Sequence, residues 1–146
     1  MNALEEPVPP RLDLPAVPDS VPHARAVLTA FARACGADDA IAANVGLSVS
    51  EAVSNVVLHA YRGDHGAGRL TVRADCDEGL LEIVVTDEGS GLQPRTDSPG
   101  LGLGLALMAA VTTSLQLDHD GAATRVHLTF ALTPAEERAE QQLRSM

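Results

Sequence analysis

Apolar residues recur with helical spacing over two stretches in the first half of the chain. From Val21 the apolar positions follow a spacing of three and four residues, and Gly36 is placed to cap the end of that helix. A second, longer helix is predicted to begin at Asp38 or Asp39 and to run to about His59. Its apolar stripe is rich in β-branched valine, so packing against the rest of the protein must hold it.

In the second half of the chain the apolar period shortens to two, as in half-buried strands. Two pairs of strands, each joined by a short turn containing Asp and Gly, are predicted at 70–74 with 80–86 and at 115–119 with 124–132. Between the pairs, a loop rich in Gly, Asp, Ser and Pro leads to an apolar helix over 102–113. This order of elements predicts an α+β fold, a two-layer sandwich of helices on one face of a mostly antiparallel sheet.

The chain is expected to form one folded domain with two polar ends. Its 146 residues are enough to bury a core without a disulfide framework. Residues 1–10 are proline-rich and are predicted to be a flexible arm, and the folded domain spans 11–133, beginning with a short extended piece. Residues 134–146 are predicted to be a polar helix or tail, because they offer almost nothing apolar to pack.

The charge balance narrows the classes of function. Twenty acidic against ten basic residues give a net charge of −10, which repels a phosphate backbone, and aromatic residues are only 2%. Nucleic acid is therefore excluded as a direct partner. All ten basic residues are arginine. The absence of lysine excludes a P-loop and Schiff-base chemistry.

The cysteines and the start of the chain bear on its compartment. Cys35 and Cys76 are the two cysteines, and without a signal peptide they are interpreted as reduced, packed thiols. The first ten residues are acidic and proline-rich, and the longest apolar run, 101–111, is interrupted by glycine and far shorter than a membrane span. The sequence thus favours a cytoplasmic protein with no membrane association.

Three short patterns could carry chemistry, and the first lies on the long helix. Glu51 and Asn55 stand four residues apart, so both side chains project from one face, and His59 continues the row. A carboxylate and an amide oxygen on one ridge suit a hard cation such as Mg²⁺ together with an activated hydroxyl or water. A solvated polar stripe opposite the valines is the alternative.

The second pattern follows an apolar strand, where Asp87 begins the run Asp-Glu-Gly-Ser-Gly. Gly89 and Gly91 would let a planar ligand approach the backbone, while the carboxylate accepts a hydrogen bond from a donor such as the amine of adenine. An ordinary glycine turn that carries acids is the alternative.

The third pattern is Gly-Leu-Gly-Leu-Gly, with glycines at Gly100, Gly102 and Gly104. It leads into the third predicted helix, so its backbone amides could bind phosphate oxygens at a helix N-terminus. It does not match the dinucleotide-binding fingerprint, and close packing of the helix against small residues is the alternative.

Other chemistries have little support. His59, His65, His119 and His127 lack the tight spacing of a structural zinc site, and the serines lack the flanking pattern of a nucleophile elbow.

In order and spacing, the three patterns resemble the N, G1 and G2 boxes of the Bergerat-fold, or GHKL, ATP-binding superfamily. The resemblance extends over roughly 12–132, and stand-alone anti-sigma-factor serine/threonine kinases are the most similar group, because 146 residues leave no room for transducer or phosphoacceptor domains. It implies a domain that binds Mg²⁺ and ATP and phosphorylates a serine or threonine of an anti-sigma-factor antagonist. A sigma factor as a second partner and a homodimer are also implied.

The resemblance also implies roles for individual residues. Glu51 would be the general base, Asn55 the Mg²⁺ ligand and Asp87 the adenine contact. Gly89 and Gly91 would shape the adenine pocket, with Thr124 as a further contact on that side.

At the phosphate end, the glycines of the third pattern would let the lid and helix amides reach the phosphates. The lid between the G1 and G2 boxes is short, and Arg95 is its one cation. Arg25 on the first helix is a candidate partner contact, with an ordinary surface arginine as the alternative. The short lid and the lack of lysine motivate a second hypothesis, a non-catalytic protein whose partner affinity is gated by nucleotide. A plain structural domain without nucleotide is the third.

Overall fold

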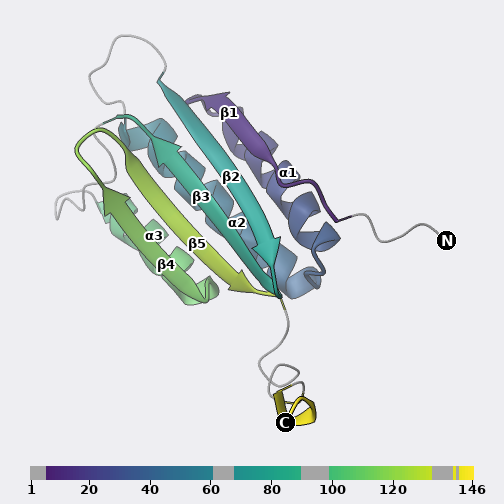
Figure 1. Cartoon of the computed structure of the whole chain (residues 1–146). Helices are drawn as coiled ribbons and strands as arrows, with labels where there is room; N and C mark the ends of the chain where they lie inside the picture. The colour runs from purple at the N-terminus through teal and green to yellow at the C-terminus, as the bar shows by residue number, and fades with distance from the viewer. Residues whose placement is uncertain (1–5, 61–67, 90–98, 133–139, 141) are drawn as a thin grey trace.

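The computed structural model describes residues 6–60, 68–89, 99–132, 140 and 142–146, with the backbone alone for 99–103. Figure 1 shows the described part as two layers, with helices packed on one face of a twisted sheet. The α+β fold predicted from the sequence is confirmed. The elements in chain order are β1 (Arg11–Pro15), α1 (Ser20–Ala34), α2 (Asp39–Asn55), η1 (Val56–Ala60), β2 (Arg69–Asp77), β3 (Leu80–Asp87), α3 (Pro99–Val111), β4 (Ser114–His119) and β5 (Thr124–Ala131).

Every strand pair of the described sheet is antiparallel, in the order β1-β2-β3-β5-β4. The predicted hairpins are β2 with β3 and β4 with β5, and β5 lies between β3 and β4. Along β5 buried and half-buried positions alternate strictly, because one face of the sheet meets the helices and the other does not. The register places Asp87, the last residue of β3, directly opposite Thr124, the first residue of β5.

Local sequence signals fix both ends of the connection between α1 and α2. Gly36 follows α1 with a φ of +104°, a conformation that glycine adopts without steric cost. The side chain of Asp38 then caps α2, because its Oδ1 accepts a hydrogen bond of 2.8 Å from the backbone N–H of Ile41. The two helices therefore turn back on each other within four residues.

The helical stretch that begins with α2 continues past Asn55 as a π-helical turn, η1. Isolated π-helical turns are frequent at functional sites, and this one directly follows the Glu51–Asn55 pair. By length and composition alone, Asp39–Ala60 could cross a membrane, and it is the one such helix among the described residues. A core helix passes the same test, and half of the apolar window is buried inside the domain.

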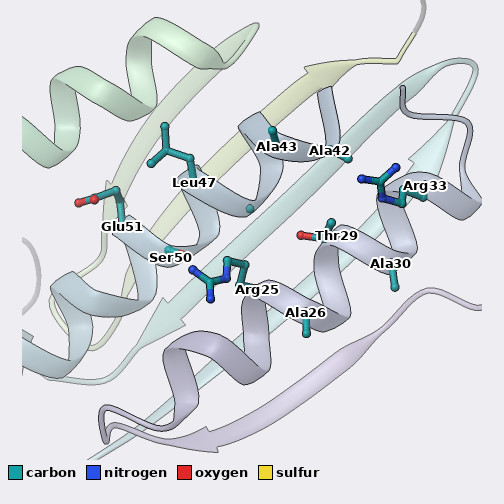
Figure 2. A pocket seen from close by; sticks show the side chains of 11 residues that line it. Arg25, Ala26, Thr29, Ala30, Arg33, Ala42, Ala43, Leu47, Ser50 and Glu51 are labelled. Carbon is teal, nitrogen blue, oxygen red and sulfur yellow. The ribbon is translucent and has the colours of Figure 1, made fainter. Parts of the chain in front are cut away.

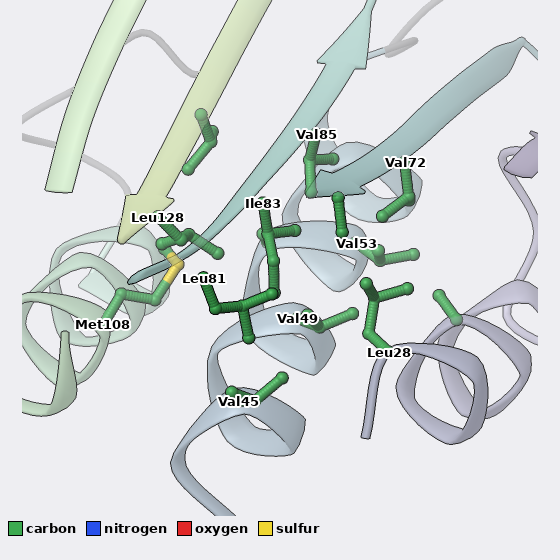
Figure 3. Packing of buried hydrophobic residues seen from close by; sticks show 14 of the residues in the cluster. Leu28, Val45, Val49, Val53, Val72, Leu81, Ile83, Val85, Met108 and Leu128 are labelled. Atoms are coloured by element: carbon green, nitrogen blue, oxygen red, sulfur yellow. The ribbon is translucent and has the colours of Figure 1, made fainter. Parts of the chain in front are cut away.

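The core lies between the helix layer and the sheet. Figure 3 shows valines of α2 and Leu28 of α1 facing the apolar residues of β2 and β3. Met108 of α3 lies in the same core, beside Leu128 and at the end away from Leu28. Leu28, Val45, Val49 and Met108 are fully buried. This packing supplies the tertiary support that the β-branched α2 requires.

The two cysteines form a disulfide, and the interpretation of them as reduced thiols is wrong in this structure. Cys35 caps the C-terminal end of α1, and Cys76 lies near the end of β2, with Cα atoms 6.6 Å apart. Gly36 turns the chain at the end of α1 beside this bond. The pairing depends on how α1 lies across the sheet, which no local pattern in the sequence reports.

Two predicted helices differ from the structure or lie outside it. The third helix is predicted over 102–113, but α3 begins at Pro99, so the glycine-rich pattern lies inside the helix and not before it. Proline is favoured at the first position of a helix because its missing N–H would have no partner there. Of the polar helix or tail predicted over 134–146, residues 134–139 and 141 lie outside the described residues.

A candidate nucleotide and phosphoryl-transfer site

The last turns of α2 bring Glu51 and Asn55 to the side of α3. Asn55 is 5% exposed, and Glu51 is half-buried one turn before it. A Cβ atom added at Gly104 would lie 2.9 Å from Glu51 Oε2 and 3.6 Å from Asn55 Nδ2. The N-box residues of α2 and the last glycine of the G2 box therefore touch, although about fifty positions separate them in the chain.

Asn55 has a hydrogen-bonding group that the described part of the chain does not satisfy. Its Nδ2 is buried and has no partner among the described residues. A buried amide without a partner costs free energy, so such groups are rare unless a ligand or water completes them. The side chain thus offers an amide oxygen for a cation and an amide donor for an anion on the surface that faces α3.

The backbone at the start of α3 also offers unpaired donors. The first turn of an α-helix leaves its N–H groups without intrahelical partners, so Gly100 and Gly102 present amides there. Gly104 lies further along and its N–H can bond within the helix. Its role is therefore steric, because a side chain at this position would reach the carboxylate of Glu51. Close packing therefore describes Gly104, while amide donation stays a prediction for Gly100 and Gly102.

The G1 box contacts the end of η1. A Cβ atom built at Gly89 would overlap the carbonyl group of Ala60, so only glycine fits between β3 and the π-helical turn. The backbone of the G1 box is thereby held against the end of the N-box helix. Gly91 and Arg95, the other predicted residues in this region, lie outside the described residues.

Asp87 is a buried carboxylate at the end of β3, with 2% of its surface exposed. Its Oδ1 accepts a hydrogen bond of 3.0 Å from the backbone N–H of Gly89. Burial raises the pKa of the Asp87 carboxyl, while the Gly89 N–H and the charge of His119 act in the opposite direction. Among the described residues Oδ2 has no bonded partner, so this oxygen is left for a ligand.

Beside Asp87, Thr124 is 3% exposed and its hydroxyl lies 2.8 Å from His119 Nδ1. The sequence predicts Thr124 as a contact on the adenine side, whereas it offers His119 only as a metal ligand. In the described residues no group of three or more His, Cys, Asp or Glu side chains could hold a metal ion. Sequence reasoning misses His119 because its relation to Thr124 depends on the register of β4 against β5, and the signal available is its place just before the Asp-Gly turn.

A groove of about 820 Å³ runs between α1 and α2 and ends at Glu51. Alanines of both helices line it, and Figure 2 shows Arg25 beside Ser50 near the Glu51 end. Arg33 lies at the other end and pairs with Asp39 at 2.6 Å. The groove is thus continuous with the side of α2 that carries Glu51.

Comparison with known proteins identifies the family of the chain. Residues 14–130 match the family described as the histidine kinase-like ATPase domain. This span includes the whole of α1 to β4 and nearly all of β5. The chain belongs to this family.

Within the family, similar proteins are serine kinases and anti-sigma factors. The chain is 31% identical over 118 residues to an anti-sigma F factor of Caldanaerobacter subterraneus, covering 73% of this chain and 81% of that protein. It is 35% identical over 88 residues to a serine-protein kinase RsbW of Bacillus licheniformis, covering 60% of this chain and 55% of the relative. The chain is therefore similar to serine-protein kinases and anti-sigma factors, and it spans about half the length of the Bacillus licheniformis kinase.

A solved structure shows the same arrangement. The RsbU and RsbW domains of a Mycobacterium tuberculosis protein include a region that matches with a TM-score of 0.70 and 28% identity. The match covers 88% of this chain and 34% of that one, so the present chain corresponds to one part of the Mycobacterium tuberculosis protein.

Proposed function

We propose that this protein binds Mg²⁺ and ATP and transfers the γ-phosphate to a serine or threonine of an antagonist protein. The observation that carries the proposal is the contact of Gly104 with Glu51 and Asn55, which joins two of the three motifs into one site. The names of the relatives, serine-protein kinase and anti-sigma F factor, support the same activity.

At the phosphate end, Asn55 would hold Mg²⁺ through its amide oxygen, and the amides of Gly100 and Gly102 would bind phosphate oxygens. The buried, unpartnered Nδ2 of Asn55 fits this assignment, because a bound anion would complete it. Mg²⁺, when bound, would neutralise charge on the phosphates, which is the main electrostatic requirement of phosphoryl transfer. Arg95 is proposed as a further cation at this end.

Glu51 would act as the general base. Its carboxylate would accept the proton of the acceptor hydroxyl as the oxygen–phosphorus bond forms and ADP leaves. Gly104 supports this role, because the absence of a side chain there leaves Oε2 room to meet a hydroxyl. Glu51 is half-buried, so it is accessible from the groove side.

At the base end, Asp87 would accept a hydrogen bond from the amine of adenine through Oδ2. Gly89 and Gly91 would give the planar base access to the backbone, and Thr124 would contact it from β5. The burial of Asp87, 2% exposed, supports this assignment, because a carboxylate withdrawn from bulk water gains from a ligand that donates to it.

The antagonist is proposed to dock along the groove between α1 and α2, with its phosphorylated residue at the Glu51 end. Arg25 lines the groove close to Ser50 and is the candidate contact. Sequestration of a sigma factor is proposed from the name of the anti-sigma F factor relative. A homodimer, a cytoplasmic location and the division into an arm (1–10), a domain (11–133) and a tail (134–146) are further proposals.

The test combines nucleotide binding with phosphate transfer. Calorimetric titration with ATP, with and without Mg²⁺, should show saturable binding that loses its Mg²⁺ dependence in Asn55→Ala. Transfer from labelled ATP to purified candidate antagonists should be lost in Glu51→Ala but not in Glu82→Ala, an exposed carboxylate on β3. Activity that survives in Glu51→Ala would refute the assigned base. Binding without transfer to any antagonist would favour the non-catalytic, nucleotide-gated alternative.

A further inference from the structure

A row of polar side chains crosses three strands at the base end of the proposed site. Asp87 of β3 pairs with Thr124 of β5, and Thr124 pairs with His119 of β4. Directly opposed residues of antiparallel strands point to the same face, with Cβ atoms about 5 Å apart. Here that face is the helix side, where Leu70 of β2, 2% exposed, closes the row beyond Asp87.

The middle residue of this row can act in two ways toward a ligand. A threonine hydroxyl carries one proton and two lone pairs, so it donates or accepts according to where the proton points. Thr124 is almost fully buried, and its Oγ1 lies 2.8 Å from His119 Nδ1. The direction of its proton is therefore decided by the histidine and not by bulk water.

We infer that His119 is a positioning residue that accepts the Thr124 hydroxyl proton at Nδ1, so that Thr124 presents only lone pairs to the nucleotide base. In a neutral imidazole one nitrogen donates and the other accepts, so this arrangement places the ring proton on Nε2. His119 is exposed, and water is available to Nε2–H. The inference rests on the proposed function, because it concerns the same nucleotide pocket.

This arrangement makes the proposed pocket prefer adenine over bases with a 6-oxo group. Asp87 Oδ2 and Thr124 Oγ1 become two acceptors side by side, which fit the 6-amino group of adenine. The 6-oxo group of hypoxanthine or guanine is itself an acceptor, so it faces two acceptors with no proton between them.

The first test measures base discrimination at pH 8, where an imidazole is mainly neutral. Dissociation constants for ATP and inosine triphosphate, which differ in the 6-substituent and in the proton on N1, are compared in wild type and in two variants. In His119→Phe the Thr124 hydroxyl is free to turn and donate, so the preference for ATP should fall about tenfold. His119→Asn restores an acceptor near the position of Nδ1 and should restore the preference.

A double variant and a spectrum separate the outcomes. Thr124→Val combined with His119→Phe should have the same preference as Thr124→Val alone, because His119 acts only through the Thr124 hydroxyl. In the nucleotide-free protein, long-range proton–nitrogen NMR should show His119 protonated on Nε2, with an Nδ1 resonance that moves in Thr124→Val. A proton on Nδ1, or an unchanged ATP preference in His119→Phe, would overturn the inference alone. Failure of the wild type to bind ATP, with the expected NMR spectrum, would overturn the proposed function and leave the hydrogen bond intact.

Discussion

Gly104 of α3 packs directly against Glu51 of α2, with its missing Cβ only 2.9 Å from the carboxylate oxygen Oε2. The same missing atom would lie 3.6 Å from Asn55 Nδ2. The glycine therefore sets the space around both N-box side chains. Because the nearest atom is the end of a flexible side chain, a larger residue would displace the carboxylate before it disturbed the fold.

Gly104→Ala is therefore expected to separate activity from stability. Alanine is favoured over glycine inside a helix by about 1 kcal/mol, which offsets the cost of moving the carboxylate. We expect the melting temperature to change by a few degrees at most, while phosphate transfer falls at least about tenfold because Glu51 is displaced from its reactive position. Thermal denaturation and transfer from labelled ATP measure the two effects.

The control for this variant is Gly46→Ala. Gly46 also lies in a helix at a close contact, where a Cβ atom would lie 3.2 Å from Thr29 Oγ1. It touches neither Glu51 nor Asn55, but a Cβ atom there would lie 3.4 Å from Arg25 Cγ in the proposed docking groove. Gly46→Ala should therefore change the KM for the antagonist and leave kcat intact, whereas Gly104→Ala should lower kcat. Equal activity in Gly104→Ala and wild type would contradict the role given to Glu51.

Asp87→Asn is predicted to weaken nucleotide binding and to stabilise the protein. Burial raises the pKa of Asp87, so the folded state holds this proton more tightly than the unfolded state does. The stability of wild type must then decrease as the pH rises through the interval above the ordinary value of 3.8. The neutral amide removes this cost at pH 7, while its Oδ1 can still accept from Gly89.

The measurement is a melting curve for Asp87→Asn and wild type at several pH values. We expect the variant to melt a few degrees higher at pH 7 and the difference to vanish near pH 3, where Asp87 is protonated in both states. ATP affinity should fall by tenfold or more, since an amide presents a donor as well as an acceptor. A variant that melts below wild type at pH 7 would show that the charged carboxylate stabilises the fold, which contradicts burial as the dominant effect on Asp87.

The sequence predicted the parts of this site that depend on local spacing. Glu51 and Asn55 share a helix face because they stand four residues apart, and Asp87 ends a strand because an alternating apolar run precedes it. The order of helices and strands was enough to predict the layered fold. These features follow from periodicity within single elements.

Contacts between elements that are far apart in the chain could not be predicted from local sequence patterns. The contact of Gly104 with Glu51 requires the crossing of α2 and α3, and the relation of His119 to Thr124 requires a strand register that a shift of one residue would abolish. The prediction that Cys35 and Cys76 are reduced thiols was wrong for the same reason, since the distance between them is set by how α1 lies on the sheet.

Because of the disulfide, we expect the melting temperature of the protein to depend on redox conditions. It closes a segment of 41 residues, and constraint of the unfolded chain over such a length contributes about 4 kcal/mol. Reduction should therefore lower the melting temperature by roughly 10 °C. Melting curves with and without a phosphine reductant test this, and the double variant Cys35→Ser, Cys76→Ser should melt like reduced wild type and ignore the reductant. Identical melting of oxidised and reduced wild type would contradict it.

The turn between β4 and β5 gives a prediction with the opposite dependence on pH from that of Asp87. Asp120 Oδ1 accepts hydrogen bonds from the backbone N–H groups of Ala123 and Ala122 at 2.9 and 3.1 Å, and Oδ2 accepts from Arg125 at 3.0 Å. These bonds, that of Ala123 foremost, lower the pKa of Asp120 to about 2. The unfolded state thus binds the proton more readily, so the carboxylate stabilises the fold above pH 4 and loses this effect as the pH falls toward 2.

Asp120→Ala should therefore melt below wild type at pH 7 and approach it near pH 2. The turn also sets the register that holds His119 against Thr124, so the variant should lose part of its preference for ATP over inosine triphosphate. Asp118→Ala is the matched control, because Asp118 also faces Arg125 but accepts no backbone hydrogen bond among the described residues. If Asp118→Ala and Asp120→Ala had equal effects on melting and on base preference, the charge of Arg125, and not the geometry of the turn, would be the cause.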